Sequence, residues 1–135
     1  MHSNKKAEHF VTLFDSLFLP AGLALHASLI KHAQPFHLWI ICMDLEVEHA
    51  LAAAGLDHVS LIPIADAETA ELRSVKPTRN KGEYCWTVTP HAADFVFARS
   101  REPEQVTYLD ADVFFFAPPA PLLEEFEKSA KHVMI

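Results

Sequence analysis

Two aspartates separated by one residue form the part of this sequence best suited to chemistry. Asp110 and Asp112 stand in the string Tyr-Leu-Asp-Ala-Asp-Val-Phe-Phe, residues 108–115, with apolar residues on both sides. Side chains two positions apart in an extended chain point to the same side, and a slight turn lets both carboxylates approach one cation. Two desolvated carboxylates repel each other unless a cation lies between them. Hard oxygen ligands with open positions suit Mn²⁺ or Mg²⁺, so we predict such a metal site at this pair.

The rest of the chain must position this pair, and its apolar runs alternate with helical patterns. Near-continuous apolar strands alternating with helices predict an α/β fold, a mostly parallel sheet with helices on both faces. Trp39 and the phenylalanines of 114–116 are expected in the core. The expected strands are 10–14, 36–43, 59–64 and 106–109, with an extended segment at 113–116 and a further strand beginning at 132–135. The expected helices are 21–32, a segment capped by Asp44 and ended by Gly55, a short piece at 66–72, a helix capped by Thr89, and 121–128. Residues 74–82 are expected as a polar loop, and whether 83–88 form a further helix is left open.

Polar residues gather where the expected strands end. Asp15 and Ser16 follow the first strand, Asp44 follows the second, and Asp66 and the 110–112 segment follow the later ones. Ligands of open parallel sheets bind outside the carboxyl ends of the strands. We therefore expect the functional site at this edge of the sheet.

Composition narrows the class of protein. The chain has 135 residues, half of them apolar, which is enough for a single domain over 1–135. Its net charge of −7 argues against nucleic acid as a partner. Three glycines are too few for a Gly-rich phosphate loop. The two cysteines, Cys42 and Cys85, are expected to be reduced core thiols, which favours a cytoplasmic location. No apolar run is long enough to cross a bilayer. The nine histidines lack metal-ligand spacing and are expected to be structural or on the surface.

Three features together resemble a known family. They are the opening strand 10–14 with Asp15 at its end, the Leu/Ala-rich helix containing Ser28, and residues 106–115 followed by Pro-Leu at 121–122. The chain is similar to the N-terminal, nucleotide-sugar-binding part of glycosyltransferases with the GT-A fold, most of all to glycosyltransferase family 8. The resemblance implies metal-dependent glycosyl transfer from a nucleotide-diphospho-sugar donor, a UDP-sugar, to an acceptor that the sequence does not identify.

The resemblance also assigns roles to individual residues. Asp112 would be the main metal ligand, and Asp110 would touch both the metal and the ribose. Thr12, Asp15 and Ser16 would line the pocket for base and ribose. No catalytic residue can be assigned in this way.

Two departures from the family pattern matter. Residues 84–87 read Tyr-Cys-Trp-Thr where the family often has Tyr-x-Arg-Leu. Lys76, Arg79 and Lys81 are then the candidates for a cation that contacts the nucleotide, although a basic loop is more often plain solvated surface. The family's histidine metal ligand and acceptor-side residues, which lie in its C-terminal half, have no counterpart. We therefore expect a fold cut short at its C-terminus that binds a donor without transferring sugar, and whose uncovered apolar surface drives self-association.

Two alternatives remain from the sequence. Residues 110–113 also fit the D-x-D-x-[TV] motif of haloacid-dehalogenase-type phosphatases, although only 23 residues follow Asp112 to hold the rest of that machinery. The other alternative is a non-catalytic module that binds a nucleotide sugar without turnover.

Overall fold

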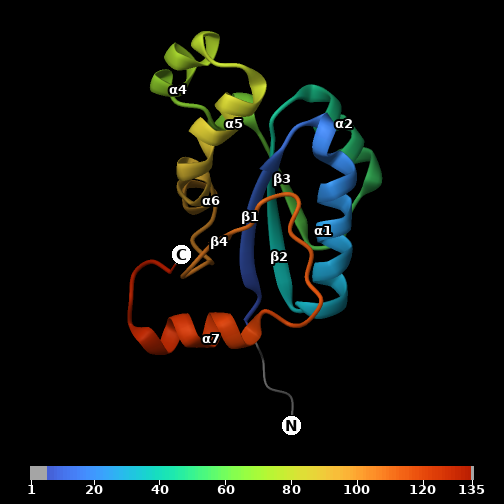
Figure 1. Ribbon diagram of the computed structural model, residues 1–135, viewed down its shortest axis with the longest axis vertical. Coiled ribbons are helices and arrows are strands. Elements are labelled where there is room, and N and C mark those ends of the chain that lie inside the picture. Colours follow the sequence, from blue (N-terminus) through green and yellow to red (C-terminus); the bar gives the residue numbers. More distant parts are fainter. Residues whose placement is uncertain (1–5, 135) are drawn as a thin grey trace.

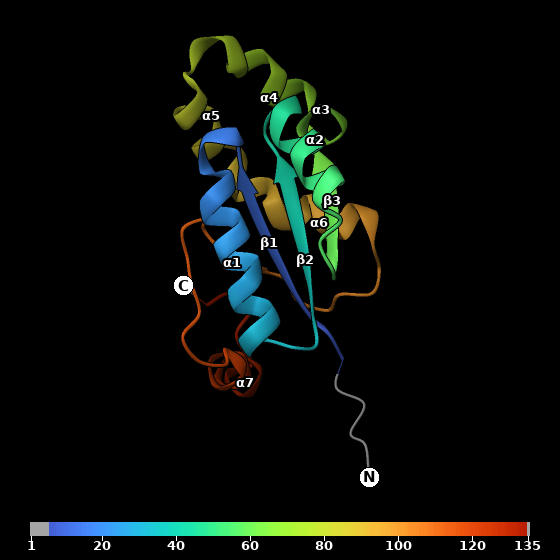
Figure 2. The ribbon, with the colours of Figure 1, turned by 90° about the vertical axis from the view of Figure 1, so that its right-hand side faces the viewer.

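A four-stranded parallel sheet forms the centre of the molecule. The computed structural model describes residues 6–134. The strands are β1 (Glu8–Phe14), β2 (Phe36–Cys42), β3 (Val59–Pro63) and β4 (Thr107–Tyr108), in the spatial order β3-β2-β1-β4. Figures 1 and 2 show helices on both faces of this sheet. The predicted α/β architecture with a parallel sheet is confirmed.

Helices α1 (Leu19–His32) and α2 (Leu45–Ala54) cover one face of the sheet. Phe10 and Phe14 of β1 point to this face and join Leu25 and Leu29 of α1 in a buried cluster. The approach is close at Gly22, because a Cβ atom there would lie 2.3 Å from the Phe14 ring. A larger residue at this position would therefore force either the Phe14 ring or α1 to move.

A run of short helices covers the opposite face, namely α3 (Ile64–Ala67), α4 (Ala70–Val75), α5 (Lys81–Val88) and α6 (Ala92–Arg99). Val11 and Leu13 of β1 point to this side and pack with Val88 and Val96, which are both fully buried. The alternation of β1 side chains between the two faces follows from the pleat of a strand.

Helix α7 (Ala120–Ser129) lies across the end of the molecule where β1 begins (Figure 1). None of its residues is fully buried. Within residues 6–134, no helix combines the length and the apolar character that a membrane span requires.

The segment between β3 and α6 differs from the sequence-based expectation. Residues 74–82 are not one loop, because α4 continues to Val75, a 3-10 turn follows at Lys76–Thr78, and α5 begins at Lys81. Asn80 and Glu83 form a reciprocal capping box that starts α5. Thr89 is not an N-cap, since its hydroxyl donates to the carbonyl of Cys85 in the preceding helix.

The last part of the described chain is also less regular than expected. β4 has only two residues, and residues 113–115 run without strand pairing. No strand forms at 132–134, and Ile135 lies outside the described residues. Phe114 and Phe116 are 46% and 85% exposed rather than buried, because of these three phenylalanines only Phe115 packs on the core. Trp39 is half-buried.

Candidate functional site

Asp44, which follows β2, forms hydrogen bonds with the turn that follows β1 and so connects the carboxyl ends of the two strands. Its Oδ2 accepts hydrogen bonds from the backbone N–H and the hydroxyl of Ser16, both at 3.0 Å, and its Oδ1 accepts from the N–H of Val47 at 2.7 Å. One carboxylate thus caps α2 and holds the turn that follows β1. The predicted cap is confirmed, but the bonds to Ser16, 28 positions away, come only from the tertiary structure.

The ionised form of Asp44 is favoured by these bonds. Burial by itself raises the pKa of the carboxyl group, but the hydrogen bonds from Ser16 and Val47 and the nearby Lys81 outweigh it and hold the pKa below its usual value. The side chain therefore carries a negative charge near neutral pH.

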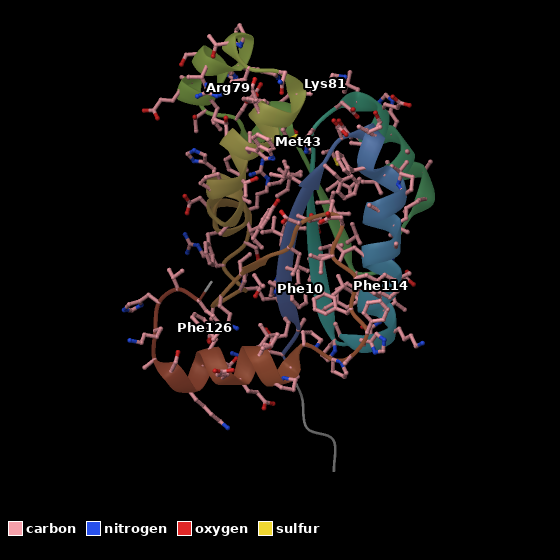
Figure 3. The ribbon with its side chains drawn as sticks, in the orientation of Figure 1. Phe10, Met43, Arg79, Lys81, Phe114 and Phe126 are labelled. Atoms are coloured by element: carbon pink, nitrogen blue, oxygen red, sulfur yellow. The ribbon has the colours of Figure 1, made fainter. Side chains whose placement is uncertain are left out.

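A cavity of about 180 Å³ opens beside Asp44 at this edge of the sheet. It combines two carboxylates, three cations and a partly apolar wall. Figure 3 shows Arg79, Lys81 and Met43 together at this end of the molecule. A cavity of this size is smaller than the roughly 300–1,000 Å³ of typical ligand sites, so it can hold only a part of a nucleotide. Its lining residues are Asp15, Met43, Asp44, Lys76, Arg79, Asn80, Lys81, Tyr84 and Cys85.

The wall formed by α4 and α5 is braced by Glu68, whose side chain is 8% exposed. Its carboxylate accepts a hydrogen bond from the Tyr84 hydroxyl and pairs with Lys76 at 3.4 Å. The Lys76 ammonium also lies 5.2 Å from the centre of the Tyr84 ring. Lys76 is therefore engaged within the protein, whereas no ion pair is found for Arg79 or Lys81 among the described residues.

The Asp110 and Asp112 pair lies in a turn just after β4. The N–H of Leu109 donates to the carbonyl of Val11 at 2.9 Å, which continues the pairing with β1, and the N–H of Val113 closes the turn on the carbonyl of Asp110 at 3.1 Å. Both aspartates are exposed, which corrects the expectation that flanking apolar residues desolvate them. The intervening Ala111 is instead the residue that packs into the core.

Tyr108 is the last residue of β4 and lies just before this turn. Burial raises the pKa of its hydroxyl to about 12, a hydrogen bond with Thr89 opposes the rise, and Asp110 and Cys85 add to it. Cys85 itself lines the cavity, and burial together with the charges of Asp15 and Asp44 raises the pKa of its thiol. The thiol stays protonated at neutral pH, as expected for a cysteine that is not a nucleophile.

Only some of the predicted site residues lie at the cavity. Asp15 lines the cavity, with Oδ1 accepting from the N–H of Leu17, and Ser16 lies behind it on Asp44. Thr12 is fully buried and does not line the cavity, and its hydroxyl finds no hydrogen-bond partner within residues 6–134. Asp110 and Asp112 do not line the cavity. Within residues 6–134, no group of three or more His, Cys, Asp or Glu side chains is arranged to hold a metal ion.

Sequence reasoning did not include Asp44 or Tyr84 among the binding residues. Asp44 is a polar residue at a strand end, but its position as a helix cap already explains its presence there, so the sequence gives no separate reason to assign it a binding role. Tyr84 carried no signal, because its place in the cavity depends on how α5 packs beside α4.

The chain resembles known proteins in sequence. No family model matches the chain. Two uncharacterized proteins of Bacillus subtilis strain 168 are similar to it: YfnF is 35% identical over 115 residues, and YfnD is 30% identical over 117. These alignments take in 85% and 87% of this chain, which spans 38% of the length of each relative.

A solved structure, the apo form of the bifunctional glycosyltransferase WbbM, superposes with a TM-score of 0.54 at 17% sequence identity. The match covers 92% of this chain and 22% of WbbM. The chain has a glycosyltransferase-like fold. At this level of identity the likeness concerns the fold, and it does not single out family 8 among glycosyltransferases.

Proposed function

We propose that this chain binds the nucleoside-diphosphate part of a nucleotide-sugar donor and belongs to a metal-dependent glycosyltransferase. The observation that carries the proposal is the cavity bearing Arg79 and Lys81 at the carboxyl edge of the sheet, with the Asp110–Asp112 turn at the end of a neighbouring strand. Cations and carboxylates at this edge match what a diphosphate and its counter-ion require. The fold shared with a glycosyltransferase supports the choice of reaction.

The carboxylates of Asp110 and Asp112 would hold Mn²⁺ or Mg²⁺. Their chemistry fits such an ion, because both are exposed oxygen ligands on one turn and leave coordination positions open for phosphate oxygens and water. A cation held there would supply Lewis acidity, which stabilises the negative charge of a departing diphosphate. The chain's own part is to present the two carboxylates from a turn that β4 and α1 keep in place.

The cavity would take the remaining parts of the nucleotide. Arg79 and Lys81 would contact phosphate oxygens, while Asp15 would accept hydrogen bonds from the ribose or the base through Oδ2. Ser16 would act through Asp44, which fixes the turn. Thr12, predicted to line the same pocket, would support this turn from the core rather than touch the nucleotide.

Calorimetric titration with UDP, with and without Mn²⁺, tests the proposal. We expect Mn²⁺ to strengthen UDP binding, and we expect the NMR shift changes on binding to include Asp15, Ser16 and residues 79–85. Equal UDP affinity in both conditions would remove the metal role. Release of phosphate from a phosphomonoester, with no UDP binding, would favour the phosphatase alternative instead.

A further inference from the structure

The segment that follows the Asp110–Asp112 turn is fastened to α1 by one side chain. The hydroxyl of Ser28 accepts a hydrogen bond from the backbone N–H of Phe115 at 3.1 Å, although the two residues are 87 positions apart. Because an N–H can only donate, the hydroxyl proton is directed elsewhere, and it bonds the carbonyl of Leu25 at 2.7 Å. Ser28 is 2% exposed, so both bonds are shielded from water.

Ser28 completes a pair of anchors around the turn. On the N-terminal side, Leu109 bonds to Val11 of β1. On the C-terminal side, Phe115 bonds to Ser28 and packs its ring 6.3 Å from that of Phe10. The backbone of residues 110–114 is held at both ends and closed by its own turn, so the fold itself fixes the segment from which the two carboxylates project. Figure 1 shows this orange segment passing beside α1 on its way to α7.

We propose that Ser28 is a positioning residue for the metal-binding turn. This inference rests on the proposed function, since it assigns a purpose to the anchor only if Asp110 and Asp112 bind a cation. Binding a cation and a diphosphate to a loose turn would include the free-energy cost of ordering it. With Ser28 in place, the turn becomes ordered when the protein folds, so the free energy of binding does not include this cost.

The test uses Ser28→Ala and Ser28→Cys, with Ser129→Ala as the matched control. Ser129 makes the same two kinds of bond in α7, donating to the carbonyl of Phe126 at 2.6 Å and accepting from the N–H of Lys131 at 3.2 Å, but it is exposed and anchors no part of the turn. A thiol is somewhat larger than a hydroxyl, so it leaves no cavity, but it accepts hydrogen bonds only weakly. Ser28→Cys therefore separates a lost hydrogen bond from lost packing.

Two measurements are made on the full chain. We expect amide hydrogen exchange of Phe115 to become at least about tenfold faster in Ser28→Ala, since its N–H loses a buried acceptor. In calorimetry with UDP, the Mn²⁺-dependent gain in affinity should fall about tenfold in both Ser28 variants, and the affinity without metal should be unchanged. Ser129→Ala should match the wild-type chain in both measurements.

Several outcomes would overturn the positioning role. They are unchanged Phe115 exchange in Ser28→Ala, full recovery of the Mn²⁺ effect in Ser28→Cys, or an undiminished Mn²⁺ effect in Ser28→Ala. A wild-type chain whose UDP affinity ignores Mn²⁺ would instead overturn the proposed function, and with it the purpose assigned to Ser28. The wild-type titration therefore separates the two failures.

Discussion

The two edges of the parallel sheet both carry a cavity with charged side chains, but they differ in the sign of the charge. The cavity at the carboxyl edge is about 180 Å³ in volume and contains Arg79 and Lys81, while the one at the amino edge is larger, about 320 Å³. Carboxylates dominate the amino-edge cavity, including those of Glu102, Glu104 and Glu127. A diphosphate would be repelled there. Charge and strand direction, rather than volume, decide which edge is suited to a nucleotide.

At the amino edge, two histidines contact each other and form hydrogen bonds with neighbouring side chains. The parallel register places His9 of β1 beside His37 of β2, with ring centres 5.8 Å apart. The indole N–H of Trp39 donates to His9 Nδ1 at 3.2 Å, and His37 Nε2 lies 2.8 Å from the Ser60 hydroxyl. These contacts bind side chains of the protein to one another, which agrees with the expected structural role of the histidines.

The largest effect is expected at the carboxyl edge, from Asp44→Ala. The variant loses an N-cap and both bonds to Ser16, so the free energy of unfolding should fall by about 2 kcal/mol, measured by urea denaturation. Asn80→Ala, which removes only the cap of α5, should cost about 1 kcal/mol. Ser60→Ala at the amino edge should cost less than either, because it removes a single bond to His37. Equal losses in Asp44→Ala and Asn80→Ala would mean that the bonds to Ser16 add nothing.

The next largest effect concerns the metal. Asp112→Asn should weaken UDP binding in the presence of Mn²⁺ by about tenfold or more, which corresponds to about 1.4 kcal/mol, because an amide is a poorer ligand for a hard cation. Glu102→Gln removes an acidic side chain from the amino edge and should leave UDP affinity unchanged. If both variants bind UDP as the wild type does, the metal is not held at the carboxyl edge.

A smaller effect is expected from the cations of the cavity. The double variant Arg79→Gln, Lys81→Gln should bind UDP about fivefold more weakly in metal-free buffer, since charge-assisted hydrogen bonds to phosphate are lost at a partly exposed site. Lys6→Gln changes a cation of the amino edge, where Lys6 pairs with Glu104, and should have no such effect. Titration calorimetry of the two variants side by side decides whether UDP affinity depends on the overall positive charge of the protein or on these particular side chains.

The smallest effect is a difference in acid sensitivity between the edges. Burial lowers the pKa of His9 and His37, so the unfolded chain binds more protons than the folded one below the usual histidine pKa of about 6.5. Stability should therefore fall as the pH drops from 7.5 to 5.5. Asp44, whose pKa is lowered, keeps its charge over this range, and its contribution should be lost only below about pH 4.

Urea denaturation at the two pH values checks this difference. His9→Gln should flatten the decline, whereas His49→Gln, an exposed histidine of α2, should leave it as in the wild type. A decline that is just as steep in His9→Gln would assign the acid sensitivity to other groups.

Local signals in the sequence were sufficient for much of the fold. Apolar runs located β1, β2 and β3 to within two residues at each end, and Asp44 and Gly55 bounded α2 as expected. Gly55 adopts a left-handed backbone with φ of 57°, which glycine tolerates best. Each of these features depends on neighbours within a few positions, so the chain itself carries the information.

The segment from residue 74 to residue 91 shows where local reasoning was insufficient. The polar composition of residues 74–82 is typical of a loop, and residues 83–88 gave no clear prediction, but the capping box of Asn80 and Glu83 and the packing of Tyr84 and Val88 on the sheet make most of this segment helical. Phe114 and Phe116 show the opposite error, since apolar residues next to an anchored segment were assigned to the core although only Phe115 is directed inward.

The sequence by itself therefore determined the α/β class, the polar strand ends and the paired aspartates, because periodicity, caps and short spacings are properties of neighbouring residues. Only the tertiary structure decided that Asp44 holds Ser16, that Arg79 and Lys81 share a cavity with Asp15, and that Ser28 fastens the segment after Asp112. These contacts join residues from 28 to 87 positions apart through the packing of helices on the sheet. No pattern of neighbouring residues encodes such packing, because it depends on how all the elements fit together at once.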